Sequence, residues 1–241
     1  MVRAPTILGM IPARGGSKRL PRKNIASVGG RPLIGWTIAA ALESGALDRI
    51  VTSTEDEEIA QVARSLGSEI PFLRPQELAG DSTSSMDVVL HMINELRDRG
   101  AYLPEYLMLL QPTSPLRNAQ DIRNVAEMAI TRNADAVVSV SALHRHPDGM
   151  KTITADGRLK PFLTDLCACT RAQDLPPIYT LNGALYLART RLLLAGKGFV
   201  EEYTYAYEMP VSRSIDIDSA WDLYLADLII RHGLQNGPHP N

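Results

Sequence analysis

Short apolar segments alternate with segments of helical periodicity along most of the chain. The apolar segments are continuous, and they end at glycine, proline or polar residues, as buried strands do. The expected strands are 6–11, 49–53, 106–110, 136–140 and 183–187, and the expected helices are 33–43, 56–66, 86–97, 120–131 and 219–232. Buried strands that alternate with helices predict an α/β fold whose mostly parallel sheet carries helices on both faces.

Two segments depart from this alternation. Residues 144–177 are rich in proline, glycine and threonine and show no clean period, which indicates an inserted arm rather than another strand–helix unit. Residues 233–241 are expected to form a flexible tail. The rest of the chain, 1–232 with the arm inserted, is expected to form a single domain.

Composition and charge narrow the class of protein. The 241 residues, 45% of them hydrophobic, are enough for one sizeable core. With 25 basic and 27 acidic residues, the net charge of −2 argues against a protein that coats duplex nucleic acid. No apolar run is long enough to cross a bilayer, and the N-terminus shows no export signal. The sequence therefore predicts a cytoplasmic protein that binds neither nucleic acid nor membrane.

A glycine-rich, strongly basic loop follows the first expected strand. Gly15 and Gly16 allow backbone N–H groups to approach a polyphosphate closely, and Ser17 adds a hydroxyl. The loop has neither the ending of a Walker loop nor the spaced glycines of a dinucleotide fingerprint. Its cations favour a triphosphate site over the alternative, a solvated basic loop. These cations are Arg14, Lys18, Arg19, Arg22 and Lys23.

An alternating acidic pair lies just before the last expected helix. Asp216 and Asp218 alternate with Ile215 and Ile217, so in an extended segment both carboxylates face one side while the isoleucines anchor the other. Two hard oxygen ligands at one place are typical of Mg²⁺ sites, where water and substrate phosphates complete the octahedron. The alternative is that both residues are merely polar, or that Asp218 shares the N-cap with Ser219.

Polar residues also follow the expected strand 106–110. Ligands gather at the carboxyl ends of strands in open α/β sheets, so Gln111, Thr113 and Ser114 are expected over the cleft. A rigid turn that caps the next helix is an alternative, and it is compatible with the first interpretation. Other chemistries are disfavoured: no Gly-x-Ser-x-Gly elbow occurs, and Cys167 with Cys169 indicates reduced thiols rather than a disulfide or a zinc site.

Four ordered motifs together resemble one family. They are Ile11–Lys18 with Lys23–Asn24, Gln111–Arg117, Asn182–Tyr186 and Ser214–Asp218. In this order they resemble the CMP-N-acylneuraminate (sialic acid) cytidylyltransferases, over nearly the whole chain. The sister enzymes that activate the eight-carbon acid Kdo share the Ile-Pro-Ala-Arg opening but lack the Gln-Pro-Thr-Ser-Pro-Leu-Arg loop.

The resemblance implies a Rossmann-like fold and the transfer of CMP from CTP to the anomeric hydroxyl of a nonulosonic sugar acid, with release of pyrophosphate. The expected nucleotide-binding residues are Arg14, Gly15, Gly16, Ser17, Lys18, Lys23, Asn24, Arg74 and Ser85. The expected acceptor-binding residues are Gln111, Arg171, Asn182 and Tyr186, and the expected Mg²⁺ ligands are Asp216 and Asp218. The arm 144–177 corresponds to the segment through which these enzymes form homodimers and reach into the partner's cleft.

In such a reaction the sugar oxygen attacks the α-phosphate in line while pyrophosphate leaves, so charge and alignment dominate catalysis. The expected catalytic residues are Lys18, Lys23, Gln111, Asp216 and Asp218. The chain offers no obvious strong base. The hypothesis is that a metal at the acidic pair lowers the pKa of the acceptor hydroxyl while Gln111 positions the acceptor.

The chain departs from the family pattern on the acceptor side. Sialic acid enzymes usually carry an arginine immediately before Gln-x-Leu-Pro, where this chain has Ala172, with Arg171 one position earlier. Thr180 stands where an arginine often precedes the Asn-Gly motif. Either Arg171 grips the sugar carboxylate, or the acceptor is legionaminic acid, pseudaminic acid, an eight-carbon acid or a phosphonate. A non-catalytic nucleotide-binding relative is disfavoured because the basic loop and the acidic pair are both retained.

Overall fold

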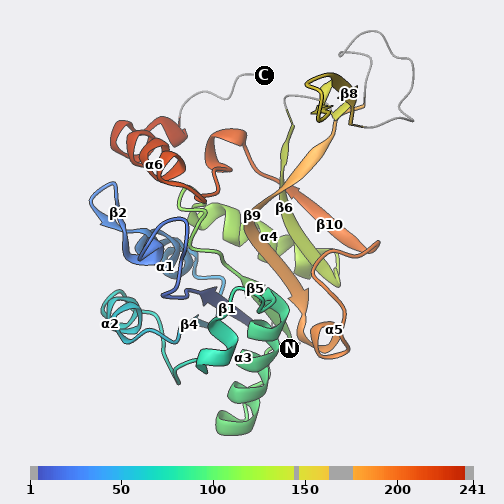
Figure 1. The fold of residues 1–241 in the computed structure, drawn as a ribbon. Helices are drawn as coiled ribbons and strands as arrows, with labels where there is room; N and C mark the ends of the chain where they lie inside the picture. Colours follow the sequence, from blue (N-terminus) through green and yellow to red (C-terminus); the bar gives the residue numbers. More distant parts are fainter. Residues whose placement is uncertain (1–4, 144–146, 163–175, 237–241) are drawn as a thin grey trace.

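The computed structural model describes residues 5–143, 147–162 and 176–236. Within these residues the main sheet consists of β1 (Ile7–Pro12), β4 (Arg49–Ser53), β5 (Tyr106–Leu109), β6 (Ala136–Ala142), β9 (Tyr179–Arg189) and β10 (Thr204–Glu208) (Figure 1). The helices are α1 (Leu33–Ser44), α2 (Glu57–Ser65), α3 (Ser85–Gly100), α4 (Ala119–Thr131), α5 (Thr190–Leu194) and α6 (Ala220–His232). Two small hairpins pair β2 (Ser27–Val28) with β3 (Arg31–Pro32), and β7 (Lys151–Ile153) with β8 (Leu159–Pro161).

The main sheet is mostly parallel with one reversed strand. Its order is β10-β6-β9-β5-β1-β4. Strands β4, β1 and β5 run parallel to one another, as do β6 and β10, whereas β9 pairs antiparallel with both β5 and β6. The predicted sheet is therefore confirmed. Because β9 is reversed, its first residues lie at the edge of the sheet where β5 and β6 end.

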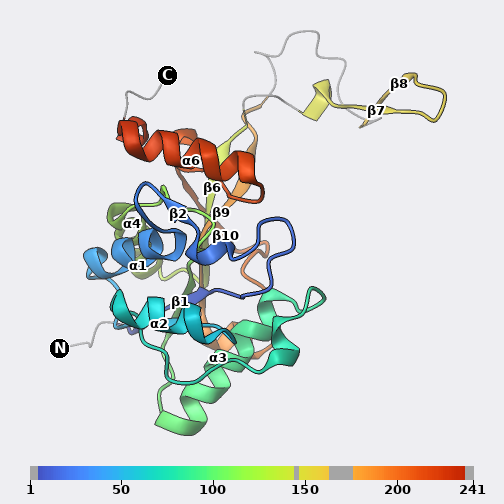
Figure 2. The same cartoon turned by 60° about the vertical axis from the view of Figure 1, so that its left-hand side comes forward.

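Helices cover both faces of this sheet, as the apolar runs predicted. Ile7 and Ile11 of β1 belong to a core cluster with residues of α1, α2 and α4, whereas Leu8 and Met10 belong to a second cluster with residues of α3 and α5. This is the alternation of a strand that is buried on both faces. Figure 2 shows α1 and α4 together on one side of the sheet.

Local signals set the limits of the helices. α2 begins after Asp56, whose Oδ1 accepts the Ile59 N–H at 3.0 Å. Capping boxes at Ser84, Asn118 and Ser219 begin α3, α4 and α6. α1 ends at Gly45 in the left-handed region. The N-cap named at Ser219 in the sequence is thus confirmed.

The sequence pattern did not predict α5 or β10, and it predicted β9 too short. α5 has five residues, too few to show a helical period. β10 lies at the edge of the sheet and most of it is exposed, so it lacks the apolar run of a buried strand. β9 begins at Tyr179, before the predicted 183–187. The pattern missed this start because the first three residues of the strand are exposed. Apolar periodicity therefore located the buried elements and missed the exposed ones.

The described part of the predicted arm is more regular than expected, since it contains the β7–β8 hairpin. In both views this hairpin lies away from the sheet and its helices (Figures 1 and 2). Ile153 and Leu159 on it are 75% and 70% exposed. Arg171, Ala172 and the two cysteines lie outside the described residues. No helix in the described ranges is long and apolar enough to cross a membrane.

Candidate active site

A cavity of about 310 Å³ opens at the carboxyl ends of β1 and β5, beside the N-terminus of α3. This is the edge at which α/β sheets bind ligands, and the volume is at the small end of ligand pockets. Hydroxyl-bearing residues at 83–85 line one part of the cavity, and cations line another. The residues predicted from the sequence that line it are Arg14, Lys23, Asn24, Arg74, Ser85, Gln111 and Thr113. Ser114, also expected over the cleft, is fully buried and is not part of the lining.

Lys23 joins the basic loop to the acidic segment. Its ammonium donates to the Ile217 carbonyl at 2.7 Å and lies 3.5 Å from Oδ1 of Asp218. Arg19 lies 3.4 Å from the other oxygen of Asp218. Lys23 is only 14% exposed, so solvent screens its contacts less than those of a surface lysine. The two segments, 194 positions apart, therefore meet at the edge of the cavity, as the enzymatic hypothesis requires.

Lys18 lies at the rim of the cavity rather than in its lining. Its ammonium is 2.5 Å from Asp81, and the Arg14 guanidinium is 3.1 Å from the same carboxylate. The hydrogen bond and charge of Lys18, with the charge of Arg14, hold the pKa of Asp81 below its usual range. Gly16 and Ser17 are likewise absent from the lining. An added Cβ on Gly16 would meet nothing within 4 Å, so the loop is open at this position.

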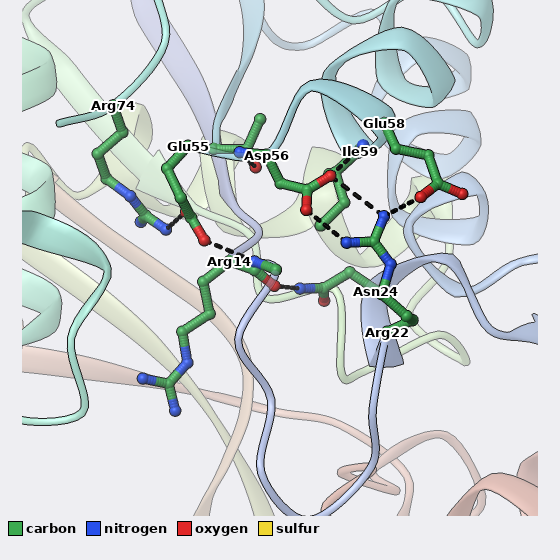
Figure 3. A network of polar contacts seen from close by, with 10 residues as sticks. Arg14, Arg22, Asn24, Glu55, Asp56, Glu58, Ile59 and Arg74 are labelled. Carbon is green, nitrogen blue, oxygen red and sulfur yellow. Dashed lines mark hydrogen bonds and ion pairs between the residues drawn. The ribbon is translucent and has the colours of Figure 1, made fainter. Parts of the chain in front are cut away.

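The backbone N–H of Gly15 does not face a ligand, contrary to the expectation from the glycine pair. It donates to Oε1 of Glu55 at 2.7 Å, and Oε2 of Glu55 accepts from Arg74 at 2.6 Å. Figure 3 shows Glu55 between Arg74 and the basic loop at Arg14. Gly15 is needed here for packing, since a Cβ would lie 2.6 Å from Oδ2 of Asp56.

Asn24 and Ser85 line the cavity in different ways. Asn24 is buried, and its amide donates to the Arg14 carbonyl at 2.9 Å, so it also braces the basic loop. Ser85 is exposed and is the first residue of α3, directly after the cap at Ser84. The N-terminus of a helix favours negative charge, which suits a phosphate at this position.

The loop after β5, the start of β9 and the acidic segment meet at Gly183. Its φ is 76°, and a Cβ there would lie 3.5 Å from Oε1 of Gln111 and 3.8 Å from Cγ of Asp216. Glycine adopts this conformation without strain. The Ile217 N–H donates to the Thr113 carbonyl at 2.8 Å and holds the acidic segment against the loop. Gln111 and Asp216 are therefore neighbours.

The acidic pair has the alternation that its sequence predicted. Ile217 is fully buried, whereas Asp216 and Asp218 are exposed. Partial burial raises the pKa of Asp216, and the charge of Asp218 raises it further, although a hydrogen bond from Thr113 opposes both effects.

Two mutually repelling carboxylates beside the cations of the basic loop fit Mg²⁺, which usually takes one or two protein carboxylates together with water and substrate phosphates. Among the described residues no cluster of three or more His, Cys, Asp or Glu could hold a metal by itself.

The side-chain amide of Asn182 is occupied by neighbouring residues of the protein. Oδ1 accepts from the Ser139 hydroxyl at 2.6 Å and from the Ala184 N–H at 3.2 Å, while Nδ2 donates to the Ser214 hydroxyl at 3.0 Å. The side chain therefore fixes the start of β9, and its contact with the sugar acid stays a prediction. Thr180, two residues earlier, is exposed on the same strand.

Tyr186 packs edge-to-face against Phe199, with the ring centroids 5.9 Å apart. Burial raises the pKa of Tyr186, and the charge of Asp216 raises it further. Its hydroxyl is consequently a neutral hydrogen-bonding group beside the acidic segment.

Two buried residues of the site were missed from the sequence, Glu55 and Arg117. The Arg117 guanidinium donates to the carbonyls of Gln111 at 3.2 Å and Ala184 at 2.7 Å, and to the Thr37 hydroxyl at 2.6 Å. Burial lowers the pKa of Arg117 to about 10. This arginine ties the loop after β5 to β9, but its partners lie as far as 80 positions away, so no local pattern revealed it.

Comparisons with known proteins give this geometry its context. A model of the cytidylyltransferase family matches residues 8–216, from β1 to the first aspartate of the acidic pair. The chain belongs to the cytidylyltransferase family. It is a CTP-dependent nucleotidyltransferase, as the four motifs predicted.

The curated relatives act on several sugar acids. The chain is 37% identical over 93% of its length to the CMP-N,N′-diacetyllegionaminic acid synthase of Legionella pneumophila, of which it covers 96%. It is 32% identical over 93% of its length to a pseudaminic acid cytidylyltransferase of Campylobacter jejuni, of which it also covers 96%. It is 34% identical over 88% of its length to an N-acylneuraminate cytidylyltransferase of Streptococcus agalactiae, but it spans only half of that protein.

Solved structures with little sequence identity share the fold. A CMP:2-keto-3-deoxy-manno-octonic acid synthetase complexed with CTP matches 95% of this chain with a TM-score of 0.69 at 15% identity. A 4-diphosphocytidyl-2C-methyl-D-erythritol synthase from Anaerococcus prevotii matches with a TM-score of 0.62 at 14% identity. These likenesses show a Rossmann-like nucleotidyltransferase fold.

Proposed function

We propose that the protein transfers CMP from CTP to the anomeric hydroxyl of a nonulosonic, sialic-acid-like sugar acid and releases pyrophosphate. The observation that carries this proposal is the contact of Lys23 with Ile217 and Asp218, at the edge of the cavity lined by Arg14 and Arg74. One cleft then combines cations for a triphosphate with carboxylates for Mg²⁺.

On the nucleotide side, Arg14, Ser17, Lys18 and Lys23 hold the triphosphate. Lys18 exchanges its partner Asp81 for a phosphate oxygen, and an exposed pair of this kind is weak enough to allow the exchange. The remaining nucleotide contacts come from Arg74, Asn24, Ser85 and the backbone at Gly16. Preorganised cations stabilise the charge that develops as pyrophosphate leaves.

On the acceptor side, Gln111 and the Tyr186 hydroxyl orient the sugar acid next to the acidic pair. Asp216 and Asp218 hold Mg²⁺, which when bound neutralises phosphate charge and lowers the pKa of the acceptor hydroxyl. Lys23 keeps Asp218 in place through the contacts described above. Arg171 stays a prediction as the partner of the acceptor carboxylate.

We also propose that residues 1–232 act as one domain with 144–177 as an inserted arm, through which two copies associate. The support is the exposed apolar surface of the β7–β8 hairpin, where Ile153, Leu159 and Phe162 are all more than half exposed. Apolar surface of this kind marks an interaction site.

Pyrophosphate release tests the proposed function directly. CTP and Mg²⁺ are held constant, and the acceptor is varied among N,N′-diacetyllegionaminic, pseudaminic, N-acetylneuraminic and Kdo acids and a phosphonate. We expect the fastest release with the legionaminic acid, because the relative named for it is 37% identical to this chain, against 32% for the pseudaminic acid relative of equal coverage. The second candidate function is the transfer of CMP from CTP to an eight-carbon sugar acid or a phosphonate. It is favoured by Ala172 and Thr180, which stand where the sialic acid enzymes often carry arginine. Release only with Kdo or the phosphonate supports it. If none of these acids leads to release of pyrophosphate, the proposal is contradicted.

A further inference from the structure

Two consecutive carboxylates after β4 hold the basic loop at both of its ends. Glu55 accepts from the Gly15 N–H, at the start of the loop, and Asp56 accepts from the Arg22 guanidinium, near its end. Figure 3 shows Glu55 beside the loop at Arg14, and Arg22 between Asp56 and Glu58. Residues 16–21, which carry Lys18 and Arg19, span the gap between these two anchors.

Glu55 is the buried member of the pair. Its side chain is 7% exposed, and that of its partner Arg74 is 3% exposed. The two carboxylate oxygens bind different groups, one the Gly15 N–H and the other Arg74, so a single side chain fixes both the loop and a residue that lines the cavity. Removing one member of such a buried pair leaves the other charge without compensation.

Asp56 performs three tasks at one point. It caps α2, it pairs with Arg22 through both of its oxygens, and it packs against Gly15, where a Cβ would collide with it. The hydrogen bond from Arg22 holds the pKa of Asp56 below its usual range, so this carboxylate is charged at neutral pH.

The pairing with Asp56 holds Arg22 in an unusual backbone conformation. Arg22 has a φ of 56°, which non-glycine residues rarely adopt. It directly precedes the short 3₁₀ turn Lys23–Ile25, which carries Lys23 to the acidic segment and Asn24 to the Arg14 carbonyl. The orientation of Lys23 therefore depends on Arg22, which is held by Asp56, the N-cap of α2, and by Glu58 in the first turn of that helix.

We propose that Glu55 and Asp56 are positioning residues that keep both ends of the basic loop in its CTP-binding conformation before the nucleotide arrives. The inference rests on the proposed function, because it takes the ligand of the loop to be the triphosphate. Neither carboxylate faces CTP, since each is occupied by the loop or by Arg74. A loop held in its bound conformation loses less entropy on binding, so the effect falls on the affinity for CTP.

Asp56→Asn is the sharpest variant, because Asn caps a helix about as well as Asp but lacks the charge that holds Arg22. We expect the Kd for CTP, measured by calorimetry with Mg²⁺ present, and the KM for CTP to rise about five- to tenfold. The KM for the acceptor acid should stay within about twofold. Glu55→Gln should raise both CTP constants at least as much, because Glu55 serves Gly15 and Arg74 together.

A second variant breaks the same pair from the side of the loop. Arg22→Gln removes a residue that is 40% exposed, and the free protein should keep its thermal midpoint. It should raise the Kd for CTP by a factor similar to that of Asp56→Asn, and combining the two substitutions should add little, as for residues that act as one contact. Glu57→Gln is the matched control: Glu57 pairs with Arg64 at 3.0 Å, and the substitution should leave the Kd unchanged.

The outcomes separate the two proposals. Wild-type values of the Kd and KM for CTP in folded Asp56→Asn and Arg22→Gln overturn the positioning role and leave the proposed function standing. A wild-type protein that binds no CTP overturns both. A rise in the acceptor KM equal to the rise in the CTP KM also overturns the positioning role, because it indicates general loosening of the site.

Discussion

The nucleotide side and the acceptor side of this site are built in different ways. On the nucleotide side, the basic loop is held by Glu55 and Asp56, which lie in one short connection 34 to 40 positions away. On the acceptor side, Gln111 and Asp216 meet at Gly183, and they come from segments far apart in the chain. The residues that hold the basic loop therefore lie close together in the chain, whereas the meeting of Gln111 with Asp216 is assembled from segments far apart.

Lys23→Ala should have the largest effect, because Lys23 contacts both sides. We expect kcat/KM to fall about 100- to 1000-fold, as when a preorganised charge is removed from a transition state. Pyrophosphate release at varied CTP measures the loss. Lys197→Ala, an exposed lysine in the turn after α5, serves as the control. A loss below about tenfold would mean that the two sides work without this link.

Replacing Asp216 and Asp218 together by Asn comes next. Turnover at low Mg²⁺ should fall about 100-fold, because the proposed function assigns the protein ligands of the metal to this pair. Titration of Mg²⁺ at saturating CTP and acceptor measures the effect. Asp98→Asn, on the exposed surface of α3, is the control for the loss of a surface carboxylate. Unchanged turnover at low Mg²⁺ would refute the role of the pair.

Gln111→Ala should separate the two sides kinetically. We expect the KM for the acceptor to rise about tenfold while the KM for CTP changes less than about twofold. The reason is its position beside Gly183 and Asp216, although Gln111 also lines the cavity. Gln120→Ala, exposed on α4, controls for loss of an amide. Equal increases in both constants would place Gln111 on the nucleotide side.

The parts of the fold and of the site that could be predicted from the sequence are those whose residues lie close together along the chain. The Gly-Gly turn, its cations and the strand before them lie within a few positions of one another, and Arg14, Lys23 and Asn24 do line the cavity. The alternation of Ile217 with its aspartates was predicted for the same reason. The buried strands and their helices were equally visible, whereas the half-exposed β10 was not.

The site contacts that could not be predicted depend on residues far apart along the chain. The Gly15 N–H and the Asn182 amide both seemed available to ligands from their motifs, yet Glu55 and Ser139 occupy them. The contact with Ser139 depends on the register of β6 with β9, which shifts between Val138 and Val140. Apolar periodicity predicts that strands exist but not their register, so these contacts could not be read from the sequence.

The smallest predicted effect is on the free energy of unfolding and comes from His91, which is not among the residues assigned to either side. Burial against Phe72 lowers the pKa of His91 on α3. The unfolded chain then binds a proton more readily than the folded one, so the free energy of unfolding should decrease as the pH falls from about 7 to about 5. His91→Gln should flatten this slope in denaturant titrations and leave the kinetics unchanged. Identical slopes in both proteins would contradict it.

The reversed strand has a mechanical consequence. β9 still pairs with β6 as far as Tyr179 and Ala142, past the point where β5 ends, so a two-stranded ribbon runs out of the sheet in the direction of the hairpin (Figure 1). At its inner end this ribbon carries Asn182, which contacts Ser214, and Gly183, which lies beside Gln111 and Asp216. A displacement of the outer end would therefore be transmitted first to Gln111 and Asp216, the residues that the proposed function places beside the sugar acid.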